Sequence, residues 1–409
     1  MMKFKYFGIV FLLALVLRLP NFWLPKSIVF DEVAGMTYSL FLLHHKPFFD
    51  VHPPMINLIY RTLIKGFHPN FINKISDNDH NFDNFPYHLL RLVTVIIGST
   101  IPVLAMIIGW DLFKNKLTSM AIGLMTAFDN ALIIFSRFIL PDMWLIFFGL
   151  IGLVLALKKD KLLTNIGIGF FMGMTVSVKW TGLGFWVVTL GILLLKKRYK
   201  GIITAMTIGL ISYIAVWILF FTSLLPGKAF SGIQSYSNKF NYPDKSNLIE
   251  IIKYLPKHHL LMFQANKVIQ SHEASSPPWL WIFGEKKFSL FTLKDRTIVL
   301  MGNLWGWWSA LAGVIYVILK RDKSKIMLVL VASYLINILP FLFFPRVFFI
   351  YHYFPALIMG YLILSSVVIE IKPKLVKWWL VMLLIVFLVI SPVTYGWKVP
   401  MWWLKILAN

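Results

Sequence analysis

The chain contains no cysteine, and it is poor in charged residues, above all in acidic ones. The absence of cysteine excludes disulfide bonds and metal sites that are built from thiolates. Charged residues make up 14% of the chain, whereas about 25% is usual in a soluble domain. This shortage excludes an ordinary water-soluble domain. The charges that are present are also unequal, because 40 Lys and Arg residues stand against 17 Asp and Glu residues.

The chain is rich in apolar sequence: 58% of its 409 residues are hydrophobic and the mean hydropathy is +0.75. Several apolar runs reach the roughly 20 residues that a helix needs to cross a bilayer. The first run has no small-residue cleavage site, so we expect a retained span and not a signal peptide. The pattern predicts an all-α polytopic membrane protein with one membrane domain, 1–409. Eleven spans are expected, at about 6–24, 89–110, 117–134, 140–157, 164–178, 181–195, 201–225, 297–319, 326–344, 350–369 and 377–393.

Much of the net charge of +23 lies in short loops between these spans. Basic short loops are typical of the cytoplasmic side of a membrane protein, so we expect a lipid bilayer and no nucleic acid as partner. The charges predict a plasma (inner) membrane protein with a cytoplasmic N-terminus and an extracytoplasmic C-terminus, where Trp397, Trp402 and Trp403 would anchor the tail. The basic loops lie at 114–116, 158–161, 196–200, 320–325 and 372–374.

Two long segments, 25–88 and 226–296, then fall on the outer side of the membrane. Residues 55–66 carry apolar side chains at helical spacing, which indicates helices that lie in the membrane interface. We expect these two external segments to carry the chemistry, with 25–88 as the catalytic loop.

Asp31 and Glu32 are adjacent acidic residues that follow the first span. Adjacent side chains point in different directions on a helix or strand, so separate roles are expected. One of them could act as a general base, with a pKa raised by its partly apolar surroundings. The alternative is a purely structural role at the start of a helix, where acidic residues are stabilising.

A second acidic turn contains Asp50 and His52, followed by Pro53 and Pro54. The two prolines restrict the backbone and favour an extended conformation at His52. The turn could support a site or could simply stiffen a loop between interfacial helices. An Asp and a His alone do not make a metal ligand set, so no cofactor is expected, although a divalent cation is possible.

Arginines near the outer ends of the spans are the candidates for binding a phosphate. An arginine in the apolar zone costs roughly 2.5–3.5 kcal/mol, unless its side chain reaches the interface. Arg18 and Arg91 could do so, or could face inward and bind a phosphate, and Arg91 is favoured. Arg137 could pair with Asp129 or serve the same pocket. Arg346 is the only charged residue between positions 325 and 370.

Other polar residues lie in short segments near the outer surface. Asp142 could cap the helix that it begins. Lys179 could reach the interface with its amine. His272 begins a segment dense in proline and tryptophan, which indicates an ordered segment packed on the membrane. Tyr351 and His352 belong to an aromatic run that could be an interfacial belt.

Six stretches of the chain carry a family resemblance: 29–32, 48–54, 136–142, 179–182, 272–281 and 346–355. Taken together and in this order, they resemble the protein O-mannosyltransferase family. This family belongs to the GT-C class of membrane glycosyltransferases that use polyprenyl-phosphate sugars. The resemblance implies a GT-C-type bundle of about eleven transmembrane helices, with interfacial helices in the two external segments.

The resemblance also implies roles for individual residues. Asp31 would be the catalytic base, and Glu32 would help to hold the acceptor. The donor phosphate would be bound by Arg91, Arg346, Arg18 and Lys179. Support for the site or for the acceptor would come from Asp50, His52, Arg137, Asp142, His272, Tyr351 and His352.

The expected reaction is inverting transfer of a sugar, with mannose favoured, from a polyprenyl phosphate to Ser or Thr hydroxyls on the outer face. Residues 33–36 differ from the histidine-containing stretch of the family, and 66–88 match none of its motifs. The second external segment is too short for the β-trefoil domain of eukaryotic members, so a bacterial or archaeal type is expected. Two alternatives remain: a GT-C enzyme that glycosylates a lipid or cell-wall polymer, and a lipid-linked sugar transporter, which would show repeated halves.

Overall fold

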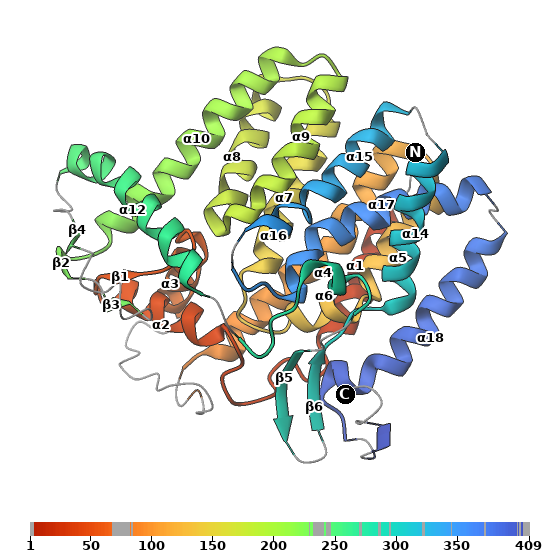
Figure 1. The fold of residues 1–409 in the computed structure, drawn as a ribbon, viewed down its shortest axis with the longest axis horizontal. Coiled ribbons are helices and arrows are strands. Elements are labelled where there is room, and N and C mark those ends of the chain that lie inside the picture. The colour runs from red at the N-terminus through yellow and green to blue at the C-terminus, as the bar shows by residue number, and fades with distance from the viewer. Residues whose placement is uncertain are drawn as a thin grey trace.

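The computed structural model describes most of the chain, and its described part is mainly helical (Figure 1). In the first external segment, residues 68–81 and 83–84 lie outside the described residues. In the predicted basic loops, residues 321–323 and 372–373 do so as well. The described residues are 4–67, 82, 85–228, 230–231, 241–242, 247–269, 272–284, 288–293, 296–320, 324–344, 346–371, 374–398, 400 and 402–403.

Each of the eleven predicted spans contains at least one helix. Five helical segments of the described chain are long and apolar enough to cross a membrane, and several shorter apolar helices pack between them. The bundle helices are α1 (Phe4–Arg18), α4 (Tyr87–Phe113), α5 (Lys116–Ala127), α6 (Asn130–Phe135), α7 (Asp142–Leu157), α8 (Leu162–Val178), α9 (Leu183–Leu195), α10 (Tyr199–Thr222), α14 (Leu304–Lys320), α15 (Lys325–Ile336), α17 (Phe354–Ile371) and α18 (Leu375–Tyr395).

Four predicted spans differ from the observed helices. The helix of the span expected at 6–24 ends at Arg18, and the span expected at 326–344 is divided into α15 and a short helix at 340–343. The span expected at 117–134 is broken between α5 and α6, because Asp129 caps α6 by accepting the Leu132 amide at 3.0 Å. The carboxylate of Asp129 also accepts hydrogen bonds from Trp307 at 2.6 Å and Tyr361 at 2.8 Å. The span expected at 297–319 begins only at Leu304, because residues 296–300 form a strand.

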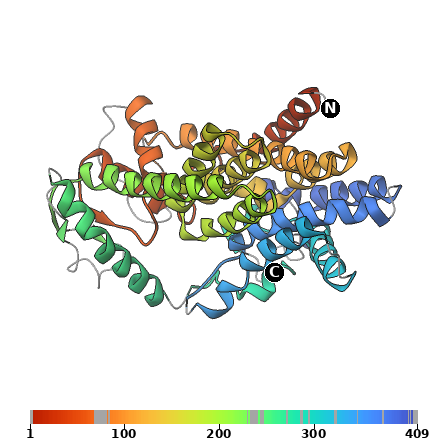
Figure 2. The ribbon, with the colours of Figure 1, turned by 90° about the horizontal axis from the view of Figure 1, so that it is seen from above.

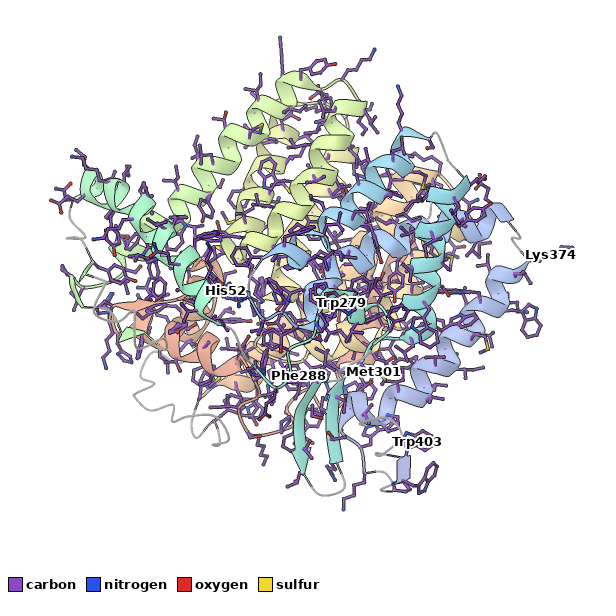
Figure 3. All side chains as sticks on the ribbon, viewed as in Figure 1. His52, Trp279, Phe288, Met301, Lys374 and Trp403 are labelled. Carbon is purple, nitrogen blue, oxygen red and sulfur yellow. The ribbon has the colours of Figure 1, made fainter. Side chains whose placement is uncertain are left out.

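The basic loops meet at one end of the bundle. Lys158, after α7, bonds Asp111 of α4 at 2.7 Å. Lys196, after α9, donates to the last backbone carbonyl of α7 at 2.6 Å. Lys116 donates to the Tyr6 hydroxyl at 2.7 Å, which brings α1 to the same end. These contacts bring three of the five predicted basic loops and the start of α1 together, as the sequence predicts. Figure 3 shows Lys374 and Trp403 at opposite ends of α18.

The opposite end carries the short elements of the two external segments, and short strands join them. β1 pairs in parallel with β3, with Phe48 opposite Phe230, and β2 pairs antiparallel with β4. β5 and β6 form an antiparallel hairpin with a bulge. The elements are α2 (Glu32–Leu43), β1 (Phe48–Phe49), α3 (Met55–Phe67), η1 (Trp180–Gly182), β2 (Gly227–Lys228), β3 (Phe230–Ser231), β4 (Asn241–Tyr242), α12 (Leu248–Val268), α13 (Pro278–Trp281), β5 (Phe288–Leu293), β6 (Arg296–Leu300), α16 (Pro340–Phe343) and η2 (Ile350–Tyr353).

Close packing within the bundle depends on small residues, as is usual between membrane helices. At Gly173 of α8, an added Cβ would lie 2.6 Å from the backbone oxygen of Gly209 in α10. The two helix backbones therefore approach so closely that a side chain would separate them. Figure 2 shows that α12, in contrast, lies along the outside of the bundle.

Candidate active site

A cavity of about 270 Å³ opens at the end of the bundle that carries the external segments. It lies between the start of α2, the turn after β1, the α8–η1 junction and the segment that precedes α17. Figure 3 labels His52, which lines it and lies near the C-terminal end of α12. The cavity brings together seven of the expected site residues: Asp31, Asp50, His52, Lys179, His272, Arg346 and Tyr351.

Asp31 presents an accessible carboxylate to this cavity. The residue occupies the N-cap position of α2, but its side chain makes no capping hydrogen bond, so helix capping does not explain it. Although the carboxylate is accessible from the cavity, the protein around it partly excludes water, and this desolvation raises the pKa of Asp31. The cations Lys179 and Arg346 act in the opposite direction on that pKa. The result is a carboxyl group suited to accepting a proton.

Glu32 lies on the opposite side of the same backbone turn and is fully buried. One of its oxygens accepts from Arg91 Nε and from the Ile139 amide, both at 2.9 Å. The other accepts from Arg91 Nη2 at 2.6 Å and from the Val29 amide at 3.0 Å. Glu32 does not line the cavity. The expectation that it holds the acceptor is therefore replaced by a structural role beside Asp31.

Arg91 is fully buried as the partner of Glu32 and does not line the cavity either. Its remaining donors bond the carbonyl oxygens of Pro25 at 2.7 Å and Ser27 at 3.4 Å. The rings of Phe82 and Phe138 each lie 5.0 Å from its guanidinium carbon. With its donors used in this way, Arg91 ties the first external segment to α4, and we do not assign it to the donor phosphate.

Arg18 and Arg137 are also buried away from the cavity. Arg18 donates to the Ser136 hydroxyl at 3.1 Å. Arg137 donates to the carbonyl oxygens of Thr394 at 2.6 Å and Asn21 at 2.9 Å. These contacts join the end of α1 to α6, α18 and the segment between α6 and α7. The expected roles of Arg18 at the phosphate and of Arg137 in site support are therefore replaced by roles in packing.

Lys179 is buried, so its amine does not reach the membrane interface. Its ammonium group donates to both carboxylate oxygens of Asp142 at 3.0 Å and lies 4.9 Å from the centre of the Tyr351 ring. Asp142 thus holds the cation in place at the wall of the cavity. A fixed ammonium group at this position can stabilise an anion in the cavity.

The second acidic turn also faces the cavity. Asp50 accepts the His52 amide at 3.1 Å and the Asn57 side-chain amide at 3.5 Å. Burial raises the pKa of Asp50 to about 6. Burial, followed by the charges of Lys179 and Arg346, holds the pKa of His52 well below its usual range. His52 is therefore a neutral hydrogen-bonding group at neutral pH.

His272 lines the cavity from the second external segment. Its Nδ1 accepts the Ala274 amide at 3.1 Å, so the neutral ring carries its proton on Nε2. The ring packs edge-on against Phe349, with the centroids 5.1 Å apart. This arrangement leaves Nε2–H as the group of His272 that can donate a hydrogen bond.

A second, mostly apolar cavity of about 440 Å³ adjoins the first. Val51, His52, Lys179 and Arg346 line both cavities, whereas His352 lines only the second. Leu183, Val187 and Ile336, which line this cavity, are exposed, so the cavity reaches the surface of the bundle. Its apolar walls include Leu183, Val187, Ile336, Phe341, Phe344 and Phe348.

Sequence reasoning missed Asn266, a buried residue of α12 that holds two parts of the site together. Its Oδ1 accepts a hydrogen bond from Arg346, and its Nδ2 donates to the Val51 carbonyl at 3.1 Å. An asparagine inside an amphipathic helix carries no sequence signal for such a role. Across the described ranges, no group of three or more His, Asp or Glu side chains could hold a metal ion, so a divalent cation stays a prediction without a ligand set.

Comparisons with known proteins agree with this geometry. Residues 8–234 match the family model of dolichyl-phosphate-mannose-protein mannosyltransferases, and residues 251–406 match that of the C-terminal four-transmembrane region of protein O-mannosyltransferase. Dolichyl-phosphate-mannose–protein mannosyltransferase 4 of Schizosaccharomyces pombe is 28% identical over 198 residues, which are 44% of this chain and 25% of that protein. Protein O-mannosyl-transferase 1 of Danio rerio is 30% identical over 212 residues, which are 50% of this chain and 27% of that protein. The matched stretches thus span about a quarter of the length of these relatives.

Solved structures confirm the fold. The Saccharomyces cerevisiae protein O-mannosyltransferase Pmt1-Pmt2 complex bound to the sugar donor aligns with a TM-score of 0.80 at 15% identity, over 100% of this chain and 92% of that one. The Archaeoglobus fulgidus oligosaccharyltransferase AglB, in complex with an inhibitory peptide and a dolichol-phosphate, aligns with a TM-score of 0.55 at 14% identity, over 98% of this chain and 57% of that one. Because one family model alone covers more than half of its length, this integral membrane chain of GT-C fold belongs to the dolichyl-phosphate-mannose-protein mannosyltransferase family.

Proposed function

We propose that the protein transfers mannose from a polyprenyl phosphate to Ser or Thr hydroxyls of proteins on the extracytoplasmic face of the membrane. One observation carries this proposal. The accessible carboxylate of Asp31 shares the first cavity with Lys179 and Arg346, and these two cations also border the second, mostly apolar cavity. A base, an anion site and a lipid-compatible cavity are thus adjacent.

The two cavities fit the two parts of such a donor. The phosphate would lie where they join, between Lys179 and Arg346, with neutral His52 as a further hydrogen-bonding group. The prenyl chain would lie along the apolar walls formed by α9, α15 and α16, which open toward lipid. The sugar would then lie in the first cavity, beside Asp31.

Transfer in this geometry would proceed with inversion. Asp31 takes the proton of the acceptor hydroxyl while the oxygen attacks the anomeric carbon, and the bond to the phosphate oxygen breaks on the opposite face. The bonding electrons leave with the phosphate, whose added charge Lys179 and Arg346 stabilise. A phosphate monoester needs this charge stabilisation more than it needs a proton.

A protein acceptor is supported by the relatives, which carry the name of protein mannosyltransferases. The sidedness of the chain supports the external location. The basic loops gather at one end, and the cavity opens at the other. By the usual bias of Lys and Arg, the basic end is cytoplasmic. We accordingly place the N-terminus inside, the C-terminus outside and the protein in the plasma membrane.

The test is transfer by the purified protein from labelled polyprenyl-phosphate-mannose to a Ser/Thr-containing peptide, analysed for anomeric configuration. We expect the anomeric configuration of the mannosyl peptide to be opposite to that of the donor. Asp31→Asn should lower kcat by about 10²–10⁴-fold, with donor binding and thermal stability retained. Retained activity in this variant would place the base elsewhere. A glycolipid acceptor in a parallel reaction tests the alternative substrate class, and transfer to the lipid alone would overturn the protein acceptor.

A further inference from the structure

α12 has the position of a helix that rests on a membrane surface. Figure 1 shows it transverse to α10, whose outer end it crosses, and Figure 2 shows it outside the bundle. A hydrogen bond of 2.8 Å between His259 and the Tyr213 hydroxyl fastens it to α10. The same hydroxyl accepts from the Trp180 indole at 3.0 Å, next to Lys179. The helix is thus fixed to the bundle at the level of the active site.

One face of α12 is buried and the opposite face is exposed, although both faces carry apolar residues. Ile251, Met262 and Ala265 pack into the protein. A second apolar stripe is exposed, which would be unfavourable in water and is typical of a helix that lies in the membrane interface. The stripe consists of Ile249, Ile252 and Leu260.

Three lysines, Lys253, Lys257 and Lys267, flank this apolar stripe on the exposed face. Glu250 is the only acidic residue of the helix. Within the described part of the chain none of the three lysines is paired with a carboxylate, and Lys267 instead lies 4.4 Å from the ring centre of Phe263. An apolar stripe bordered by unpaired lysines is complementary to a lipid surface that carries negative headgroups.

The buried face of the same helix reaches the active site through Asn266. Its amide bonds Arg346 on one side and the Val51 carbonyl on the other. One turn of α12 therefore fixes both the cation assigned to the donor phosphate and the turn that carries Asp50 and His52. A shift of α12 would move these groups relative to Lys179, which is held separately by Asp142.

We propose that α12 binds anionic phospholipid headgroups of the outer leaflet through Lys253, Lys257 and Lys267, and that this contact keeps Arg346 in position through Asn266. The membrane contact itself does not depend on the enzymatic activity, whereas its effect on the donor site rests on the proposed mannosyl transfer. Anionic lipid is thus a ligand that raises donor affinity.

The absence of cysteine from the chain permits a direct test of the contact. Ile252→Cys, labelled with an environment-sensitive fluorophore, is placed in nanodiscs of phosphatidylcholine with rising fractions of phosphatidylglycerol. We expect the label to become protected from aqueous iodide as the anionic fraction rises. The combined variant Lys253→Gln, Lys257→Gln and Lys267→Gln should bind phosphatidylglycerol more weakly through α12, by up to about fivefold for each lysine removed. A label that iodide quenches equally at every lipid composition would overturn the proposal.

A matched control removes the same charge at the other end of the bundle, with Lys159→Gln, Lys161→Gln and Lys197→Gln, all exposed. In this variant, the label should still become protected from iodide as the fraction of phosphatidylglycerol rises. The donor KM should also still fall as that fraction rises, as we expect for the original chain. An equal response of the two triple variants would show general charge attraction and would overturn a site on α12. If no variant, including the original chain, transfers mannose, the quenching result still decides the membrane contact.

The coupling to the active site has its own variant. Asn266→Ala should leave the protection of the label unchanged while it raises the donor KM and abolishes the dependence of KM on phosphatidylglycerol. An unchanged KM and lipid response in Asn266→Ala would overturn the connection through Arg346.

Discussion

At the residue scale, the chemistry of the site depends on the pKa of Asp31. Some of its surroundings disfavour the charged carboxylate and others favour it. Burial in a protein-lined cavity raises its pKa, whereas Lys179 and Arg346 lower it. Because burial has the larger effect, the carboxyl binds its proton more tightly than an aspartate in water. A general base works only in its deprotonated form.

The first prediction is a pH profile. Because the folded pKa of Asp31 is raised, kcat/KM should rise with pH through a midpoint that lies above the ordinary value of 3.8. Arg346→Gln removes a nearby positive charge, so the midpoint should move to still higher pH. The measurement is kcat/KM of both proteins across the acidic limb. A midpoint that moves downward, or not at all, would argue against Asp31 as the titrating base.

Lys179 gives a second prediction at this scale. Lys179→Met leaves Asp142 without its partner and removes an ammonium group from the cavity. We expect kcat/KM to fall by about 10²–10³-fold, as for the loss of one group that stabilises developing negative charge. The control is Lys158→Met, which removes an exposed lysine and its pair with Asp111 at the opposite end of the bundle. Equal losses in both variants would indicate a general effect on folding.

Single residues also show what the sequence can reveal. Helix geometry alone predicts that Asp31 and Glu32 have separate roles, and the motifs identify most of the residues that line the cavity. The sequence does not reveal that Glu32 bonds Arg91, which lies 59 positions away. The sequence does not distinguish a buried arginine that forms an ion pair from an arginine that binds a phosphate. Only the packing of α4 against the first external segment distinguishes them.

At the scale of elements, the Glu32–Arg91 pair connects three parts of the chain. It joins the start of α2 to α4, and through the Ile139 amide it also reaches the segment that precedes α7. All the hydrogen bonds of the carboxylate are made inside the protein. The pair therefore fixes the backbone turn from which Asp31 points into the cavity.

Breaking this pair should mainly lower the stability of the folded protein and should not affect one particular step of the reaction. Arg91→Leu leaves an uncompensated buried carboxylate, which costs about 3–5 kcal/mol. We expect a clearly lower unfolding temperature in detergent for Arg91→Leu and for Glu32→Gln, whereas Asp31→Asn should unfold like the original chain. If Glu32→Gln kept full thermal stability and only raised the acceptor KM, Glu32 would belong to the acceptor site after all.

Helix boundaries show the limit of hydropathy. Apolar composition locates all eleven segments, but it does not reveal the break at Asp129, where a buried carboxylate caps α6 and binds Trp307. Nor does it separate β6 from α14, because the β-branched run at 297–299 is as apolar as a span. Both differences arise where tertiary contacts outweigh local apolar character.

At the scale of the whole molecule, the basic loops and the active-site cavity lie apart. Basic loops gather at one end of the bundle, and the cavity with Asp31 and Arg346 opens at the other, between the two external segments. The apolar cavity extends from that point to the lipid-facing side of α9 and α15. A lipid-borne donor could thus reach the site from within the membrane, while a soluble acceptor arrives from the aqueous side.

This arrangement predicts that the length of the prenyl chain matters. Val187 lines the apolar cavity from α9 and is exposed, so Val187→Trp should fill part of the cavity without disturbing the fold. We expect the KM of a long-chain donor to rise several-fold more than that of a short, water-soluble prenyl donor, with kcat nearly unchanged, because the substitution removes binding that is the same in the ground and transition states. Ile203→Trp, exposed on α10 away from the cavity, is the control. Equal changes in KM for both donors in Val187→Trp would place the prenyl chain elsewhere on the bundle.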